Sequence, residues 1–92
     1  MKNTRQIMAV MMNNPDGEYT TKEIEENTNL ILSQVQEAIK FLMGVRIIKK
    51  PRYEKYKDNY GMPHRRAYYK LNPSKINIVI RLLREEGIGE EA

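Results

Sequence analysis

The chain has no cysteine, a single histidine and no long apolar run among its 92 residues. Without cysteine there is no disulfide framework, no thiolate metal site and no cysteine nucleophile, so an oxidising compartment is not expected. The apolar stretch Ile7 to Met12 is too short for a signal-peptide core, and no run approaches the roughly 20 residues of a membrane helix. We therefore expect a soluble, cytoplasmic protein that does not bind a membrane.

Patterns that indicate catalysis or cofactor binding are also missing. The lone histidine, His64, stands beside Arg65 and Arg66, a setting that suits neither a metal site nor a general base. The sequence has no glycine-rich phosphate loop, no nucleophile paired with a base and no paired carboxylates placed for acid and base chemistry. We expect no enzymatic activity, no metal and no cofactor.

Positive charge is concentrated in one part of the chain. The net charge is +4, but residues 46–70 contain nine Lys or Arg against Glu54 and Asp58, so this segment carries +7 and the remainder sums to −3. A positive field confined to one segment is expected where a polyanion docks. The same segment holds five of the six tyrosines.

Capping pairs and the spacing of apolar residues predict three helices in the first half of the chain. In each pair a polar side chain is followed three residues later by Glu or Gln, and the two side chains satisfy unpaired amides at the helix start. The pairs are Asn3 with Gln6, Thr20 with Glu23 and Ser33 with Gln36, and the predicted helices cover about 4–13, 21–27 and 33–43. Gly44 then stands where a left-handed C-cap is favoured. Two short helices joined by a tight turn form a helix-turn-helix.

After Gly44 the periodicity changes from that of a helix to that of a strand. Residues 45–48 predict a first strand, residues 55–64 a polar loop, and residues 67–71 the returning strand. Together they form a basic hairpin, or wing, over about 45–71. We expect one domain covering residues 1–92, because the chain is too short for a second core.

The last helix, predicted over 73–86 from the cap at Asn72 to Gly87, has two apolar faces. One face is the expected core stripe of Ile76, Val79, Ile80 and Leu83. Two further apolar residues of this helix and two methionines of the first helix are in excess of the core stripes, and a small monomer seldom leaves such a patch in water. We predict that these residues, Met8, Met12, Ile78 and Leu82, form a homodimer interface. The alternative is that Leu82 or Met8 completes the domain's own core.

This order of elements resembles a known superfamily. The stretch from Asn14 to Thr20, with the amphipathic segments around Ile24 and Val35, resembles the first half of prokaryotic winged helix-turn-helix transcription regulators. The second half, from Tyr60 through Pro73, is similar to the winged helix of archaeal transcription factor E, although that family has a zinc ribbon with cysteine ligands and this chain has no cysteine. The resemblance implies a mainly α fold with a small β-hairpin: a three-helix core, a wing and a C-terminal helix.

The resemblance also implies that the third helix enters the major groove of DNA. Residues opposite its apolar stripe, counted at 100° per residue, are the candidates for contacting base edges, since Gln can pair with adenine and Lys with guanine. These candidates are Ser33, Gln34, Gln36, Glu37 and Lys40. The alternative is an ordinary solvated face with Glu37 and Lys40 as a pair.

The basic side chains of the wing are the candidates for phosphate contacts. They are Lys49, Lys50, Arg52, Lys55, Lys57, Arg65 and Arg66. Lysines also protect strand edges from aggregation, but a charge of +7 exceeds that need. The sequence therefore predicts a homodimeric transcription regulator that binds double-stranded DNA selectively. Two alternatives stay open: a protein-interaction module of a transcription or replication assembly, and a binder of single strands or RNA that stacks bases on its tyrosines.

Overall fold

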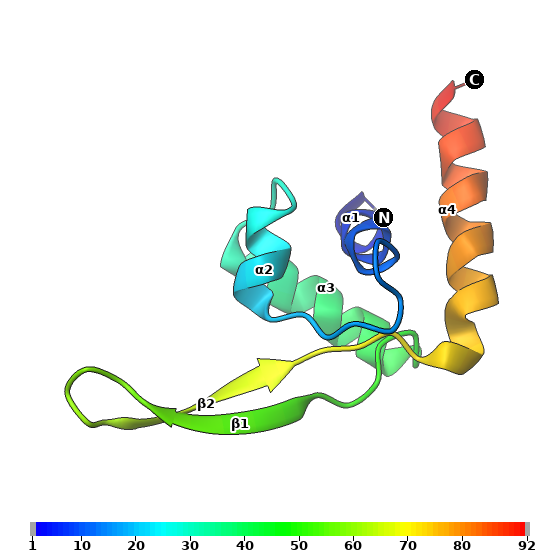
Figure 1. Ribbon diagram of the computed structural model, residues 1–92. Coiled ribbons are helices and arrows are strands. Elements are labelled where there is room, and N and C mark those ends of the chain that lie inside the picture. The colour runs from blue at the N-terminus through cyan, green and yellow to red at the C-terminus, as the bar shows by residue number, and fades with distance from the viewer. Residues whose placement is uncertain (1, 92) are drawn as a thin grey trace.

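The structure, a computed structural model, describes residues 2–91 of the chain and the side chains of residues 2–85 (Figure 1). The elements are α1 (Lys2–Met11), α2 (Thr21–Glu26), α3 (Leu32–Gly44), β1 (Arg52–Lys57), β2 (Pro63–Tyr68), the 3-10 turn η1 (Pro73–Lys75) and α4 (Ile76–Glu91). The first three helices form the body. The hairpin β1–β2 extends away from this body on one side, and α4 rises on the other.

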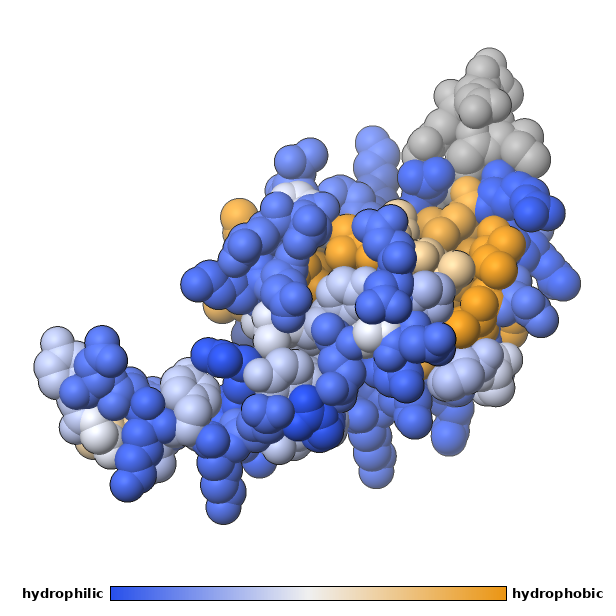
Figure 2. Space-filling model, in the orientation of Figure 1, coloured by the Kyte–Doolittle hydropathy of each residue, from blue (hydrophilic) through white to orange (hydrophobic). Residues whose placement is uncertain are grey.

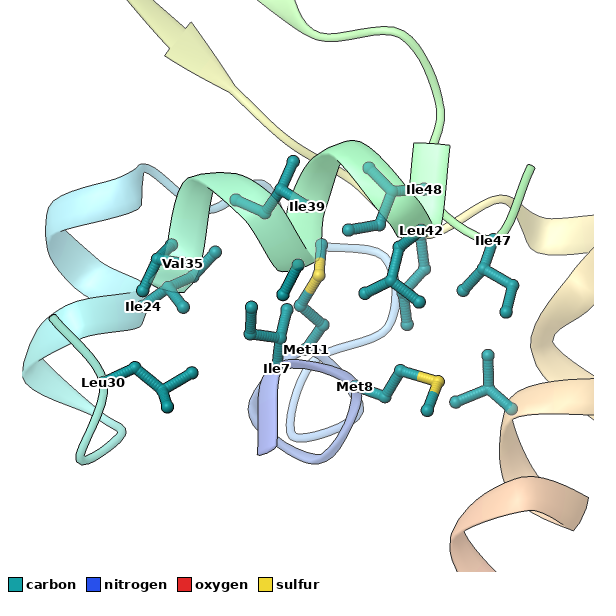
Figure 3. Packing of buried hydrophobic residues seen from close by; sticks show 13 residues of the cluster. Ile7, Met8, Met11, Ile24, Leu30, Val35, Ile39, Leu42, Ile47 and Ile48 are labelled. Atoms are coloured by element: carbon teal, nitrogen blue, oxygen red, sulfur yellow. The ribbon is translucent and has the colours of Figure 1, made fainter. Parts of the chain in front are cut away.

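The core lies where α1, α2, α3 and the first half of α4 meet (Figure 3). The apolar stripes predicted for the first and third helices are confirmed, because Ile7, Val10, Met11, Val35, Ala38, Ile39 and Leu42 are all buried. Ile24 from α2 and Val79 from α4 are fully buried against them. Each of the large aliphatic residues contributes about 1.5–3 kcal/mol by leaving water.

One of the three predicted capping pairs is confirmed. At the start of α2, the Thr20 hydroxyl accepts a hydrogen bond from the Glu23 amide (3.1 Å) and the Thr20 amide donates to the Glu23 carboxylate (3.0 Å). The pair at Asn3 is wrong, because α1 begins at Lys2 and ends at Met11, two residues earlier than predicted at each end. The Gln6 side chain instead accepts from the backbone amide of Asn29 (3.3 Å) and so joins α1 to the turn after α2.

Ser33 is not the cap of α3. The helix begins at Leu32, Ile31 occupies the cap position, and the side-chain oxygen of Gln34 accepts from the Ile31 amide at 3.1 Å. An amide side chain three residues into the helix therefore replaces the hydroxyl that sequence reasoning expected. Gly44 is likewise the last residue of α3 and not a left-handed cap. At this end of the helix the residue with positive φ is Arg46 (64°).

The turn at Arg46 directs the chain back into the core. The amides of Ile47 and Ile48 both donate to the Leu42 carbonyl, at 2.9 and 3.2 Å, and both side chains are buried. The strand predicted over 45–48 is therefore wrong, and only a single bridge, between Ile48 and Leu71, forms there. A second bridge joins Tyr19 to Tyr69.

The two strands of the hairpin extend into the segment predicted to be its loop, residues 55–64, and β2 ends at Tyr68, before the predicted end of the returning strand at residue 71. β1 and β2 pair antiparallel from Arg52 opposite Tyr68 to Lys57 opposite Pro63, so only residues 58–62 form the loop. Every residue of β1 is exposed. The apolar alternation by which a half-buried strand is recognised is therefore absent from this part of the sequence.

The start of the last helix is confirmed and its end is not. The Asn72 side chain accepts from the Ser74 amide (3.2 Å) with Pro73 at the first helical position, but these residues form η1, which leads into α4. The helix continues past Gly87 to Glu91. Ile80, predicted to be in the core, is exposed. Over the described residues, no helix has both the length and the apolar character required to cross a bilayer.

Candidate nucleic-acid interface

The hairpin presents different side chains on its two faces. Side chains alternate along a strand and directly paired residues point to the same side, so the register assigns each residue to a face. The outer face carries Tyr53, Lys55, Lys57, Pro63, Arg65 and Ala67. The inner face carries Arg52, Glu54, Tyr56, His64, Arg66 and Tyr68.

The outer face has three exposed cations, and neither strand places a carboxylate there. Lys55 and Arg65 are directly opposite each other, and Lys57 follows two residues later. The Arg65 guanidinium lies 4.3 Å from the centroid of the Tyr53 ring, which orients the cation without neutralising it. Like charges directly opposite each other destabilise a strand pair. The hairpin therefore gains nothing from this arrangement by itself, and an anionic partner would relieve the repulsion.

The inner face is close to neutral because Arg52 is bound by carboxylates. Its Nε and Nη2 donate to the two oxygens of Glu18, both at 2.9 Å, and its Nη1 donates to Glu54 at 2.7 Å. These hydrogen bonds raise the pKa of Arg52, and the bond from Arg52 lowers the pKa of Glu18. The same guanidinium lies 4.5 Å from the centroid of the Tyr68 ring. Arg52, predicted to contact phosphate, is instead engaged in fixing the base of the hairpin to the segment before α2.

Arg66 lines a groove between the hairpin and the start of α2. Its guanidinium lies 4.7 Å from the centroid of the Tyr56 ring, and hydrogen bonding with Tyr68 raises its pKa. These three side chains face Thr20 to Lys22 across an open groove of ≈ 520 Å³. Arg66 therefore stays cationic and exposed, and it is held in place by aromatic rings.

The loop at the hairpin tip is organised by Asp58. Its Oδ1 accepts from the amides of Tyr60 and Met62, both at 2.9 Å, and its Oδ2 lies 2.8 Å from Nε2 of His64. The bond with His64 and the Met62 amide lower the pKa of Asp58. Gly61 adopts a φ of 76° in this turn, and Tyr60, at 91% exposure, projects from the tip.

The predicted base-contacting residues of α3, Ser33, Gln34, Gln36, Glu37 and Lys40, are all exposed. Gln34 and Glu37 line a groove against the first turn of α1, so this flank faces the N-terminus. The side-chain oxygen of Gln34 already accepts a hydrogen bond from the Ile31 amide. Within the described residues no ion pair joins Glu37 to Lys40, and both charges remain open to solvent.

Lys49 and Lys50 join α3 to the hairpin. With Met43, Gly44 and Arg46 they line an open groove of ≈ 550 Å³ at the C-terminal end of α3. Cations are favoured at this end of a helix, where the carbonyl dipoles point outward. A second group of exposed cations therefore lies at the C-terminal end of α3, in addition to those on the outer face of the hairpin.

Two solved structures share this arrangement. A PadR family transcription regulator from Clostridium difficile R20291 superposes with a TM-score of 0.74 at 17% identity, over 99% of this chain and 93% of that one. The chain has a winged helix-turn-helix fold. A possible transcriptional regulator from Methanosarcina mazei Go1 superposes with a TM-score of 0.65 at 21% identity, over 99% of this chain and 75% of that one. No protein-family model and no curated protein matches the sequence.

In this winged helix the residues predicted to form a dimer interface do not share one environment. Met8 is 3% exposed and belongs to the domain's own core, so it is not in excess of the core stripe. Met12 and Leu82 are partly buried against the same core. Only Ile78 is an exposed residue, at 41%. Among the described side chains of α4, the large aliphatic ones that remain exposed are Ile78 and Ile80, which are two residues apart and therefore lie on opposite flanks of the helix, on either side of buried Val79.

Three contributors to the candidate interface were not singled out from the sequence. Glu18, which neutralises Arg52, is 34 residues away along the chain, and no local pattern pairs them. Asp58 lies in the segment predicted to be a loop, where it accepts hydrogen bonds from the turn that follows it. Its spacing to Gly61 is the sequence signal by which this turn could have been found. Ile31 was assigned no role, because aliphatic residues are disfavoured at helix caps and the cap was predicted at Ser33.

Proposed function

We propose that this winged helix is a transcription regulator that binds double-stranded DNA, with α3 in the major groove and the wing on the flanking phosphates. The observation that carries the proposal is the outer face of the wing, where Lys55, Lys57 and Arg65 are exposed beside one another without a carboxylate. Such a surface neutralises phosphates, and Lys49 and Lys50 add two exposed cations at the C-terminal end of α3.

The aromatic contacts of the wing favour duplex over single-stranded nucleic acid. A single-strand binder stacks unpaired bases on open aromatic rings. In the wing, Tyr53, Tyr56 and Tyr68 each already lie beneath an arginine guanidinium. These rings therefore serve to hold the cations in place, which suits contacts with a phosphate backbone.

A titration with matched nucleic acids tests the proposal. A pool of duplexes with randomised centres and the same pool as single strands are titrated with the full chain at 50 and 200 mM salt. We expect tighter binding to duplex and, for six or more phosphate contacts, a loss of affinity of about 10³-fold between the two salt concentrations. Equal binding to single strands, or weak binding without salt dependence, would contradict the proposal.

We further propose that the regulator is a homodimer whose contact includes the open side of α4. Ile78 and Ile80 are exposed on the two flanks of α4, and an apolar groove of ≈ 330 Å³, lined by Met8, Phe41, Val45 and Leu82, runs between α4 and the body. Apolar side chains gather in this region of Figure 2. A two-fold contact is the commonest way to cover such a patch, and it would present two α3 helices to adjacent half-sites.

Sedimentation tests the dimer separately from DNA binding. The Ile78→Glu, Ile80→Glu double variant should sediment as a monomer under conditions where the wild type sediments as a dimer. An Asn77→Glu variant on the same helix is the matched control, because Asn77 is an exposed polar residue. A wild type that remains monomeric at high micromolar concentration would refute the dimer but not the duplex binding.

A further inference from the structure

Two neighbouring aliphatic side chains are exposed at the start of α3. Ile31, at the cap position, is 65% exposed, and Leu32, the first residue of the helix, is 46% exposed. The preceding residue, Leu30, is 8% exposed and fills the core beneath them. The chain thus buries one aliphatic residue of this turn and leaves the next two in water.

The fold has no evident use for an isoleucine at the cap. Ile31 makes no side-chain hydrogen bond to the helix, and its own amide is satisfied by Gln34. Ser, Thr, Asp or Asn would stabilise the helix at this position, whereas an aliphatic residue is among the least favoured. A single exposed aliphatic residue is ordinary on a protein surface. Here two consecutive aliphatic residues are exposed, at the start of the helix that is proposed to bind DNA. We therefore look for the group of the binding partner that they contact.

We propose that Ile31 and Leu32 determine sequence specificity by contacting the 5-methyl groups of thymine in the major groove. This inference rests on the proposed duplex binding. In a helix-turn-helix the N-terminal residues of the second helix contact base edges. The thymine methyl is the apolar group on those edges, and aliphatic side chains recognise it by contact.

The surroundings of the pair match duplex DNA better than an apolar protein surface. The first turn of α3 has no acidic residue, so nothing there repels phosphates. Ser33 and Gln36 follow on the same exposed helix and supply groups that hydrogen-bond to neighbouring bases.

Deoxyuridine substitution isolates the methyl group. Duplexes that the wild type selects from a randomised pool are resynthesised with each thymine replaced in turn by deoxyuridine, which changes only the methyl. We expect at least one thymine in each selected site at which the loss of the methyl weakens binding about fourfold, the value of one buried methyl group.

Variants of the two side chains show whether the effect of the thymine methyl depends on Ile31 or Leu32. The Ile31→Ala and Leu32→Ala variants should bind the thymine duplex more weakly, and at least one should be indifferent to deoxyuridine at the sensitive position. Ile31→Val, which retains methyl groups at this position, should stay sensitive. Met62→Ala is the control and should keep the sensitivity, since Met62 is a comparably exposed apolar residue (59%) in the loop of the hairpin, outside α3 and outside the groove of the proposed dimer. Thermal unfolding of each variant shows that it folds.

The outcomes separate this inference from the function on which it rests. If no duplex is enriched from the pool, both are refuted. If duplexes bind but deoxyuridine costs the wild type and both alanine variants equally, the effect belongs to the DNA itself, and only the thymine contact is refuted. If deoxyuridine has no effect at any position, the contact is refuted in the same way.

Discussion

In a triple variant, Lys55, Lys57 and Arg65 are each replaced by Gln. This removes the charge of the outer face while keeping a shorter aliphatic stem at each position. If each cation neutralises one phosphate, each contributes about 0.9 to the slope of log affinity against log salt, so the triple variant loses about 2.7. Between 50 and 200 mM salt this corresponds to about 40-fold less sensitivity to salt. Because these contacts carry no sequence information, the loss should be similar for every duplex.

Fluorescence anisotropy with a labelled duplex over a salt series measures this slope. Arg84→Gln is the control: Arg84 is an exposed cation on α4, on the side of the body away from the hairpin (Figure 1), so we expect the slope to stay unchanged. The reasoning is wrong if the triple variant keeps the wild-type slope. It is also wrong if Arg84→Gln lowers the slope as much as one outer-face substitution does.

Three further predictions concern stability. Ile31→Ser supplies the missing cap, so it should stabilise the chain by about 1 kcal/mol and raise the melting temperature by about 4–8 °C, and it should lose the sensitivity to deoxyuridine at any position where Ile31→Ala loses it; an unchanged melting temperature would count against the account of the cap. Thr20→Ala breaks the capping box of α2 and should cost about 1 kcal/mol in chemical denaturation, whereas Thr21→Ala, the adjacent control, should cost less. The pKa of Asp58 is lowered in the folded state, so its contribution to stability is present above its usual value of 3.8 and is lost as the pH falls through the lower folded value. Amide NMR signals of the tip should therefore change with a midpoint below 3.8, and a midpoint above it would contradict the hydrogen bonds seen at Asp58.

The parts of the fold that follow from local rules were predictable. The stripes of α1 and α3 and the capping box at Thr20 depend on residues three or four apart, and all of them are as expected. The start of α3 was misplaced because both a hydroxyl at Ser33 and an amide at Gln34 can satisfy a free backbone amide there. Sequence alone does not decide between two helix starts one residue apart.

The errors over the hairpin and α4 have a different cause. A strand exposed on both faces has no apolar period, so residues 55–57 were assigned to the loop and no strand was predicted over 52–54, although the pairing of β1 is maintained by the backbone and by arginine–tyrosine contacts. In α4 the helical wheel assigned Ile80 to the core and Leu82 to the outside. The position of the helix against α1 reverses this, and only the tertiary structure fixes that position.

The ion pair between Glu18 and Arg52 bears on the length of DNA that would separate the contacts of the wing from those of α3. A two-stranded hairpin without a core is floppy by itself, but this one is tied at its root to the segment that precedes α2. The span between the tip of the wing and α3 is thereby fixed before any partner arrives, and little conformational entropy remains to be lost on association. If α3 binds in the major groove and the wing contacts the flanking phosphates, as we propose, the protein itself sets the distance between these two contacts, and bending of the hairpin would not accommodate base pairs inserted between them.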